Sequence, residues 1–288
     1  NVMGGMQDNG SWHGPAYAWI NSGIRNYYWD NVGGGDGFDV MPDPEDASWV
    51  YSMSQGGNVG RQNWKTGEGW FIKPPALDPK TKLRFNWNSA IAQNPFDKKT
   101  IYFGSQFLHK SNDKGVNWDI ISPDLTSNDS VKIAAYQNTG GLTLDITGAE
   151  TYGTILTIEP SKKEEGTIWV GTDDGNLQLT RDGGKTWTNF RGKIPGMPLG
   201  CWIPQVKASA HNAGEVFVVA NDSFETLDIQ QGRFNFPQIA DLLPGVQDGN
   251  KLYIYNAVTK KDSLVYKSNT NIRFVLNSFI DSSFIFIE

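Results

Sequence analysis

A segment of strand, turn, strand, tight turn and strand is repeated along the chain. Its clearest copies lie at residues 100–118 and 167–187, and weaker copies begin near residues 2, 49 and 215. The first strands of successive copies, near residues 2, 49, 100, 167 and 215, are therefore 47, 51, 67 and 48 residues apart. An interval of about 40 to 50 residues is typical of the four-stranded blades of a β-propeller. We therefore predict an all-β chain of four-stranded antiparallel blades, with about five blades that form a ring or part of a larger propeller.

The segments between the copies complete this prediction. A further strand is expected in three of them, at residues 84–92, 153–158 and 203–209. The longest interval contains an insertion at about residues 123–150. We expect the blades to occupy residues 1–222. Residues 223–288 contain no tryptophan and no further copy of the tight turn, so they are predicted to form a divergent blade or strands that close the ring.

The tight turn of the repeat carries the pattern Ser/Thr-x-Asp-x-Gly-x-Thr-Trp. The pattern is complete at residues 180–187, and residues 111–118 carry a version in which Asn117 replaces the threonine. An aspartate in such a turn accepts hydrogen bonds from backbone N–H groups of the turn, and the tryptophan packs between sheets. We therefore predict structural roles for four residues, Asp113, Trp118, Asp182 and Trp187.

Charge and composition argue against several classes of function. The chain has 25 Lys and Arg against 31 Asp and Glu, and the basic residues form no stripe, so we expect no nucleic-acid partner. No apolar run of about 18 residues occurs, so no membrane span is expected. The histidines, His13, His109 and His211, lack metal-ligand spacing, and no phosphate-binding motif is present. We expect neither a metal nor a cofactor.

Six longer motifs connect the chain to other proteins. They lie at residues 4–15, 32–38, 84–88, 118–126, 148–154 and 169–175. Together with the tight turn, which is known as the Asp box, they resemble the BNR-repeat propeller proteins, whose blades recur in sialidases, oligoxyloglucan-type glycoside hydrolases and sortilin-type receptors. Over about residues 1–222, the chain is similar to a group of large bacterial exported proteins labelled "glycosyl hydrolase, BNR repeat" or "sortilin-like".

The resemblance implies a location and an assembly. Members of that group are exported, so we expect a secreted, periplasmic or cell-surface protein, although the chain itself shows no signal peptide. Their propellers are longer than this chain. A partner chain, or blades that precede residue 1, would then complete the propeller.

Several carboxylates fall in the loops that would surround the propeller axis. Glycoside hydrolysis requires two carboxylates, about 5 Å apart for retention of configuration and roughly 6.5–9.5 Å apart for inversion. Asp36 is a candidate because three glycines precede it and allow a ligand to approach the backbone closely. Its candidate partners are Asp8, Glu150 and Asp173. The alternative is that these aspartates only cap their own turns.

Other polar and aromatic residues in the same loops are candidates for ligand binding. They are Trp12, His13, Gln55, Arg61, Asn86, Trp87, Asn88, Tyr152 and Asp174. Further aromatic residues, including Trp19 and Tyr27, would serve as sugar platforms or, as we expect, pack between blades. The few arginines form no group, which argues against sialidase chemistry.

Three functions are compatible with this sequence. We favour a binding propeller that recognises a glycan, a peptide or a protein partner on its axial face. The alternative is a glycoside hydrolase that cleaves a polysaccharide with a pair of axial-loop carboxylates. A second alternative is a structural part of a larger assembly, because an incomplete ring exposes strand edges to partners.

Overall fold

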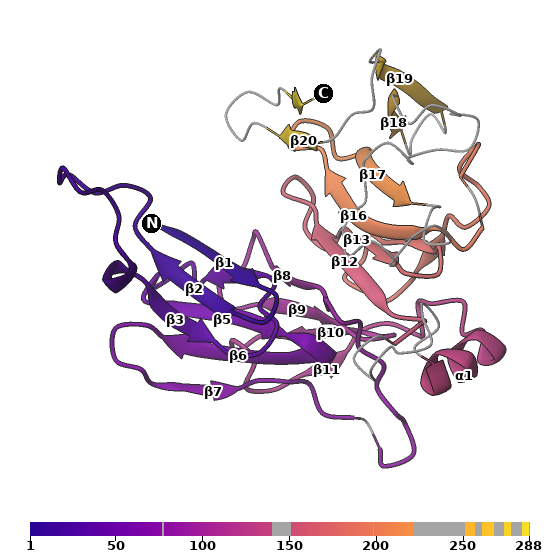
Figure 1. Ribbon diagram of the computed structural model, residues 1–288. Helices are drawn as coiled ribbons and strands as arrows, with labels where there is room; N and C mark the ends of the chain where they lie inside the picture. The colour runs from indigo at the N-terminus through magenta and orange to yellow at the C-terminus, as the bar shows by residue number, and fades with distance from the viewer. Residues whose placement is uncertain are drawn as a thin grey trace. The chain divides into compact units, whose positions relative to one another are not determined.

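The computed structural model describes residues 1–76, 78–139, 151–197 and 199–221, together with the backbone of four C-terminal strands, β18 to β21. Within these residues the chain forms six antiparallel sheets, four of which have four strands (Figure 1). In each four-stranded sheet the strands follow one another in chain order. The predicted all-β fold of four-stranded antiparallel blades is confirmed.

The chain divides into two compact units, each described here by itself. The first consists of residues 1–123 and 130–155, and the second of residues 124–129 and 156–288. The first unit begins with a three-stranded sheet, β1 (Val2–Met6), β2 (Gly10–Gly14) and β3 (Asp30–Gly33). Two four-stranded sheets follow it. The first of these is β4 (Val40–Pro42), β5 (Trp49–Ser54), β6 (Asn58–Asn63) and β7 (Gly69–Phe71). The next is β8 (Ile91–Gln93), β9 (Ile101–Gly104), β10 (Leu108–Ser111) and β11 (Asp119–Ile120).

The second unit contains two further four-stranded sheets and a hairpin. One sheet is β12 (Ile155–Pro160), β13 (Ile168–Thr172), β14 (Leu177–Thr180) and β15 (Thr188–Asn189). The other is β16 (Trp202–Ala208), β17 (Glu215–Asn221), β18 (Lys251–Asn256) and β19 (Lys261–Lys267). The hairpin is β20 (Phe274–Asn277) and β21 (Phe284–Ile287). Strands β18 and β19 thus continue the sheet that β16 and β17 begin.

The second strands of three of the four-stranded sheets, β5, β9 and β13, are predominantly apolar and form much of the core. Every residue of β9 and β13 is buried, so these strands are buried on both faces. In the first unit the core gathers around Tyr51, Met53 and Phe103. In the second it gathers around Trp169 and Ile203.

The two Asp-box turns have the same hydrogen bonds position by position. Between β10 and β11, Asp113 accepts the backbone N–H of Asn117 at 2.8 Å and its side-chain amide at 2.6 Å. Between β14 and β15, Asp182 accepts the backbone N–H of Thr186 at 2.9 Å and its hydroxyl at 2.6 Å. These donors hold the pKa of each aspartate below its ordinary value. The amide of Asn117 therefore takes the place of the threonine hydroxyl.

Two features differ from the sequence-based expectation. The strand expected at residues 84–92 is reduced to β8, because residues 84–90 form a loop in which the side chains of Arg84 and Asn86 donate hydrogen bonds to Gly153 and Thr154. The insertion at about residues 123–150 contains a helix, α1 (Ser130–Thr139), that was not expected. Its apolar residues follow no clear helical period, so periodicity could not reveal it.

Candidate functional site

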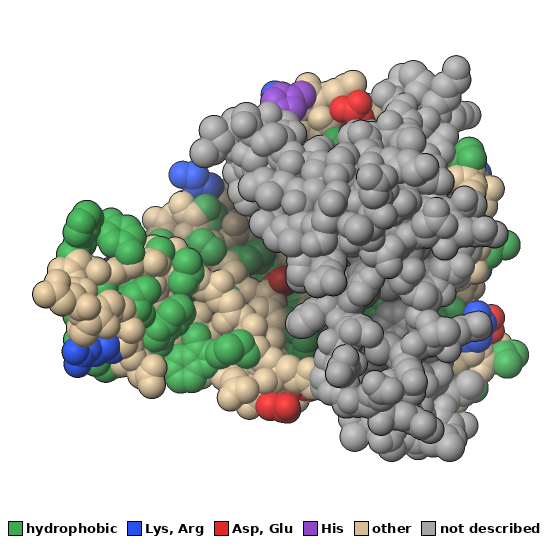
Figure 2. Space-filling model, turned by 45° about the horizontal axis from the view of Figure 1, so that its top comes forward, with side chains coloured by type: hydrophobic (Ala, Val, Ile, Leu, Met, Phe, Trp, Pro, Cys, Tyr) green, Lys and Arg blue, Asp and Glu red, His purple; other side chains and the backbone are tan. Residues whose placement is uncertain are grey.

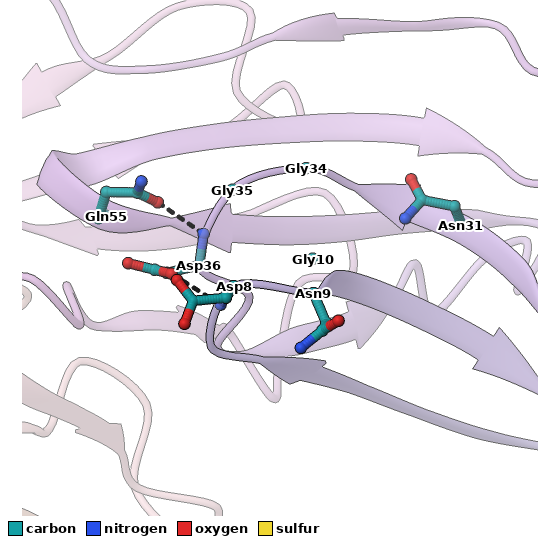
Figure 3. A pocket seen from close by; sticks show the side chains of 8 residues that line it. All are labelled: Asp8, Asn9, Gly10, Asn31, Gly34, Gly35, Asp36 and Gln55. Atoms are coloured by element: carbon teal, nitrogen blue, oxygen red, sulfur yellow. Dashed lines mark hydrogen bonds between the residues drawn. The ribbon is translucent and has the colours of Figure 1, made fainter. Parts of the chain in front are cut away.

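A pocket of about 510 Å³ opens at one end of the first two sheets (Figure 3). Three segments form it: the turn between β1 and β2, the residues from β3 into the following loop, and the first residue after β5. The lining residues are Asp8, Asn9, Gly10, Asn31, Gly34, Gly35, Asp36 and Gln55. All of these side chains are polar or absent, so the pocket suits a polar ligand.

Asp36 connects the loops that surround this pocket. One carboxylate oxygen accepts the backbone N–H of Asp8 at 2.8 Å, and the other accepts the indole N–H of Trp87 at 3.0 Å. The backbone N–H of Asp36 in turn donates to the side-chain oxygen of Gln55 at 2.8 Å. Figure 3 shows Asp8 and Asp36 next to each other with Gln55 beyond them. Asp36 is therefore held at its backbone and at both carboxylate oxygens.

Glycines allow the backbone segments at this end of the sheet to approach one another. Gly10 has a φ of 72°, and a Cβ there would overlap the carbonyl oxygen of Gly33. A Cβ on Gly37 would overlap the carbonyl oxygen of Gly10. The backbone N–H of Gly10 also donates to the carbonyl of Gly35 at 2.9 Å. No other residue type fits these positions, which explains the glycine-rich sequence around Asp36.

Trp87 reaches this region from the loop that precedes β8. Its ring packs edge-on against Phe38, with the ring centres 5.5 Å apart. The neighbouring Asn86 is buried and donates to the hydroxyl of Thr154 at 3.0 Å, while its oxygen accepts the backbone N–H of Asn88 at 3.1 Å. Asn86 therefore fixes the loop, and Asn88 is exposed on it.

The pocket can both donate and accept hydrogen bonds. Asp8, Asn9 and Asn31 are exposed, and their carboxylate and amide groups offer both kinds of partner. No lysine, arginine or large apolar side chain is among the lining residues. Within the described part of the chain, no group of three or more His, Cys, Asp or Glu residues is arranged to hold a metal ion.

Three other predicted ligand-binding residues are engaged elsewhere. The indole N–H of Trp12 donates to the carbonyl of Asn9 at 2.6 Å, which supports the β1–β2 turn. The ring of His13 is buried and stacks on Trp64 with the centres 4.2 Å apart. Neither Trp12 nor His13 lines the pocket.

Arg61, the third of these residues, belongs to a buried ion pair. Its guanidinium group lies 2.9 Å from the carboxylate of Asp43 and over the ring of Trp49. Lys114 approaches the same carboxylate to 2.8 Å. Burial opposes ionisation of Asp43, but these hydrogen bonds outweigh it and hold its pKa below the ordinary value. The geometry accounts for Arg61 without a ligand.

The remaining candidates do not line this pocket. Asp173 and Asp174 are buried in the second unit, where Asp174 accepts the hydroxyl of Thr172 and the backbone N–H of Ser127, each at 2.6 Å. Tyr152 is buried in the first unit, with the ammonium group of Lys132 5.6 Å from its ring centre. Glu150 lies outside the described residues.

Asn9 and Asn31 line the pocket but were not predicted from the sequence. Asn9 is next to Asp8 in the same turn, so the Asp-Asn-Gly sequence could have indicated it. Asn31 lies within β3, and nothing in the sequence shows which residue of a strand ends next to a neighbouring turn. Asp8, Asp36 and Gln55 were predicted, and the structure brings these three together at one pocket.

Comparison with known proteins identifies the fold. No protein-family model and no curated protein matches the chain. An ancestral GH74 enzyme has a similar structure, with a TM-score of 0.50 and 11% identity over 92% of this chain and 30% of that chain. The Niastella koreensis GH74 enzyme gives a TM-score of 0.49 and 16% identity, over 94% of this chain and 36% of that chain. The extracellular domain of the putative one-component system BT4673 from B. thetaiotaomicron gives a TM-score of 0.49 and 11% identity, over 99% of this chain and 30% of that chain.

The similarity to the ancestral GH74 enzyme supports a β-propeller-type fold for the chain and, at such low identity, no more than the fold. The chain spans about a third of the length of each of these three structures. None of them is named as a BNR or Asp-box protein, so membership of that group stays a prediction. Among the described helices, none is both long and apolar enough to cross a membrane.

Proposed function

We propose that this chain is an exported, BNR-type propeller that binds a glycan in the pocket formed by Asp8, Asn31 and Asp36. The observation that carries the proposal is the chemistry of the lining: carboxylate and amide groups, with no cation and no large apolar side chain. Neighbouring hydroxyl groups of a sugar donate to carboxylates and accept from amides. An anionic ligand would lack a cationic partner here, and an apolar peptide side chain would find no apolar surface.

The bonds around Asp36 favour binding because they hold the pocket in one shape before a ligand arrives. Asp8, Trp87 and Gln55 come from three separate segments and all bond to Asp36. A site that is already ordered loses less conformational entropy when it binds. The bonds to Asp36 therefore favour affinity for a ligand without requiring a chemical step.

Glycoside hydrolysis is the second candidate, because two carboxylates face the same pocket. N–H groups donate to both oxygens of Asp36 and hold its carboxylate in place, while the side chain of Asp8 is exposed. These two carboxylates would then share the roles of general acid and of nucleophile or base.

A secreted, periplasmic or cell-surface location is part of the proposal. It rests on the resemblance of residues 1–222 to exported proteins. A structural role in a larger assembly is compatible with either function, since the chain spans about a third of the structures it resembles. Size measurement of the protein in solution would show whether copies of the chain associate.

The test is a binding screen with matched variants. The purified protein would be titrated with plant, algal and host polysaccharides and with a peptide panel, and released sugars would be measured by mass spectrometry. We expect a polysaccharide to bind, and Asp8→Asn and Asn31→Ala each to weaken binding about tenfold, because each removes one or two hydrogen bonds. Glu68→Gln, an exposed carboxylate change in the β6–β7 turn, is the control and should leave affinity unchanged.

The outcomes separate the candidates. Binding without released sugar supports the binding propeller. Released sugar that disappears in Asp8→Asn, while the variant remains folded, supports the hydrolase. If folded protein binds no polysaccharide, or if Glu68→Gln weakens binding as much as Asp8→Asn, the glycan pocket is wrong.

A further inference from the structure

The loop between β2 and β3, residues 15–29, exposes an unusual number of large apolar side chains. Trp19 is 90% exposed, Tyr27 71% and Tyr17 67%, and Ile20 and Ile24 are also exposed. The expectation that Trp19 and Tyr27 pack between blades is therefore wrong. Figure 1 shows this loop extending beyond the ends of the strands, and hydrophobic side chains gather at the left of Figure 2. Soluble proteins rarely expose several apolar groups together unless they contact something.

The loop has an ordered structure at its base and at its tip. Trp29 packs so closely against Gly14 that a Cβ on Gly14 would overlap the indole ring of Trp29. Near the tip, the backbone N–H of Gly23 donates to the carbonyl of Ile20 at 2.9 Å, which closes a turn. The hydroxyl of Tyr27 donates to that of Tyr28 at 2.8 Å. The exposed rings are thus presented by a folded loop.

The position of the loop separates it from the pocket. The register of β1, β2 and β3 pairs Gly10 with Met6 and pairs His13 with Asp30. The pocket therefore lies at one end of this sheet and the loop leaves from the other end. In the two sheets that contain an Asp box, β8–β11 and β12–β15, the tight turn joins the last two strands, just as residues 15–29 join β2 and β3. A surface that contacts the loop would leave the pocket open.

The charge of the loop points to the kind of surface it contacts. Arg25 is the only charged residue between Gly14 and Asp30, whereas the whole chain carries a net charge of −6. Indole and phenol groups combine an apolar ring with a polar end, and for that reason they are enriched where a bilayer meets water. Isoleucines beside them would enter the acyl region, and a cation favours lipid phosphate.

We propose that residues 15–29 bind the surface of a lipid bilayer. The rings favour a bilayer over a protein because they do not form one flat face. Tyr17 meets Trp19 edge-on at 89°, and Tyr27 meets Tyr28 at 42°. Protruding rings at different angles would need a matching cleft in a protein partner, whereas a fluid bilayer surrounds them without one. The proposal does not depend on what the pocket binds.

The experiment measures sedimentation of the full chain with lipid vesicles. Two kinds would be used, phosphatidylcholine alone and an equal mixture of phosphatidylcholine and phosphatidylserine. We expect the wild type to sediment with both, and the double variant Trp19→Ser with Tyr27→Ser to bind at least about tenfold more weakly, since it loses two buried rings. Arg25→Gln should weaken binding to the mixed vesicles more than to phosphatidylcholine.

Phe71→Ser provides the matched control. Phe71 is 82% exposed on β7, outside the loop, so this variant removes a comparable aromatic side chain from the same unit. It should bind vesicles as the wild type does, and circular dichroism would show that every variant is folded. If the wild type does not sediment with vesicles, the lipid proposal is wrong. Equal losses in Phe71→Ser and in the double variant would also overturn it.

Discussion

The carboxylate of Asp36 shows how one side chain can organise a site. It accepts hydrogen bonds from Asp8 and from Trp87, which lie on opposite sides of it in the sequence. An exchange of carboxylate for amide keeps the shape of the group but turns one acceptor into a donor. Such a change tests whether Asp36 holds the loops or serves only a ligand.

Asp36→Asn should therefore lower the free energy of unfolding. One of its two N–H partners would face another donor, and an unsatisfied group of this kind costs about 1–3 kcal/mol. Urea denaturation followed by tryptophan fluorescence would measure the change. Asp8→Asn, whose carboxylate is exposed, should differ from the wild type by less than about 0.5 kcal/mol. Equal stability of Asp36→Asn and wild type would show that Asp36 does not hold the loops.

His109 provides a second test at the level of one residue. The ring is buried, accepts or donates a hydrogen bond with Ser105 at 2.8 Å, and burial lowers its pKa to about 4. In the unfolded chain the pKa returns to about 6.5. Between these two values the unfolded state binds more protons than the folded state, so acid favours unfolding.

We expect His109 to contribute to loss of stability as the pH falls from about 6.5 to 4, by up to about 3 kcal/mol in all. The stability should be fully present above pH 6.5. Urea denaturation at several pH values would give the slope, and His109→Gln, which cannot gain a proton, should show a shallower slope over the same interval. Parallel slopes for the two proteins would contradict this role of burial.

At the level of single elements, the two Asp-box turns allow a direct comparison. Asn117 and Thr186 occupy equivalent positions and each donates to its aspartate at 2.6 Å from the side chain. The sequence made the turn at residues 111–118 look degenerate, but the structure gives it the same bonds. The two residue types should therefore be interchangeable.

Asn117→Thr should change the free energy of unfolding by less than about 0.5 kcal/mol, because a hydroxyl replaces the amide donor. Asn117→Ala removes the side-chain bond and should cost about 0.5–1.5 kcal/mol. Thermal and urea denaturation of both variants would be compared with the wild type. If the threonine variant is as unstable as the alanine variant, a threonine hydroxyl at position 117 does not stabilise the turn as the amide of Asn117 does, although the two positions have the same geometry.

The elements that sequence could predict are those buried on both faces. Strands β5, β9 and β13 follow the repeat interval, since continuous apolar segments at fixed spacing require neighbouring sheets. Helix α1 could not be predicted because its apolar residues lack a helical period. The exposed rings of Trp19 and Tyr27 were also out of reach, since composition does not show which loop extends past its sheet.

The same limit applies to the candidate site. Asp8, Asp36 and Gln55 were predicted because glycine-rich loops between strands gather around a propeller axis. Asn31 was not, because it belongs to a strand. Arg61 was proposed for a ligand, yet it pairs with Asp43, and no sequence pattern shows which carboxylate a distant arginine meets.

On the scale of the whole molecule, the chain has two compact units and each has its own core. Met53 belongs to the core of the first unit and Ile203 to that of the second, and both are almost fully buried. Removing a buried side chain destabilises the unit that surrounds it. Where units are stabilised separately, unfolding need not occur in one cooperative step.

Met53→Ala and Ile203→Ala should each affect one unit. Each substitution costs about 2–5 kcal/mol. Hydrogen–deuterium exchange with mass spectrometry should show faster exchange in peptides of residues 1–123 for Met53→Ala, and in peptides of residues 156–221 for Ile203→Ala. Faster exchange throughout the chain in both variants would show that the two units unfold as one.

The glycines beneath the pocket have a consequence for how this protein can diversify. Gly10 and Gly37 leave no room for even one extra carbon atom. Substitutions at these two positions should therefore be selected against, whichever ligand the pocket binds. Asp8, Asn9 and Asn31 stand on that backbone with exposed side chains that can change, although Asp8, with a φ of 62°, is restricted to the few residue types, such as asparagine and glycine, that tolerate this conformation. Related chains that kept the glycines could thus acquire different ligand preferences through a few surface changes, while the backbone of the pocket stays the same.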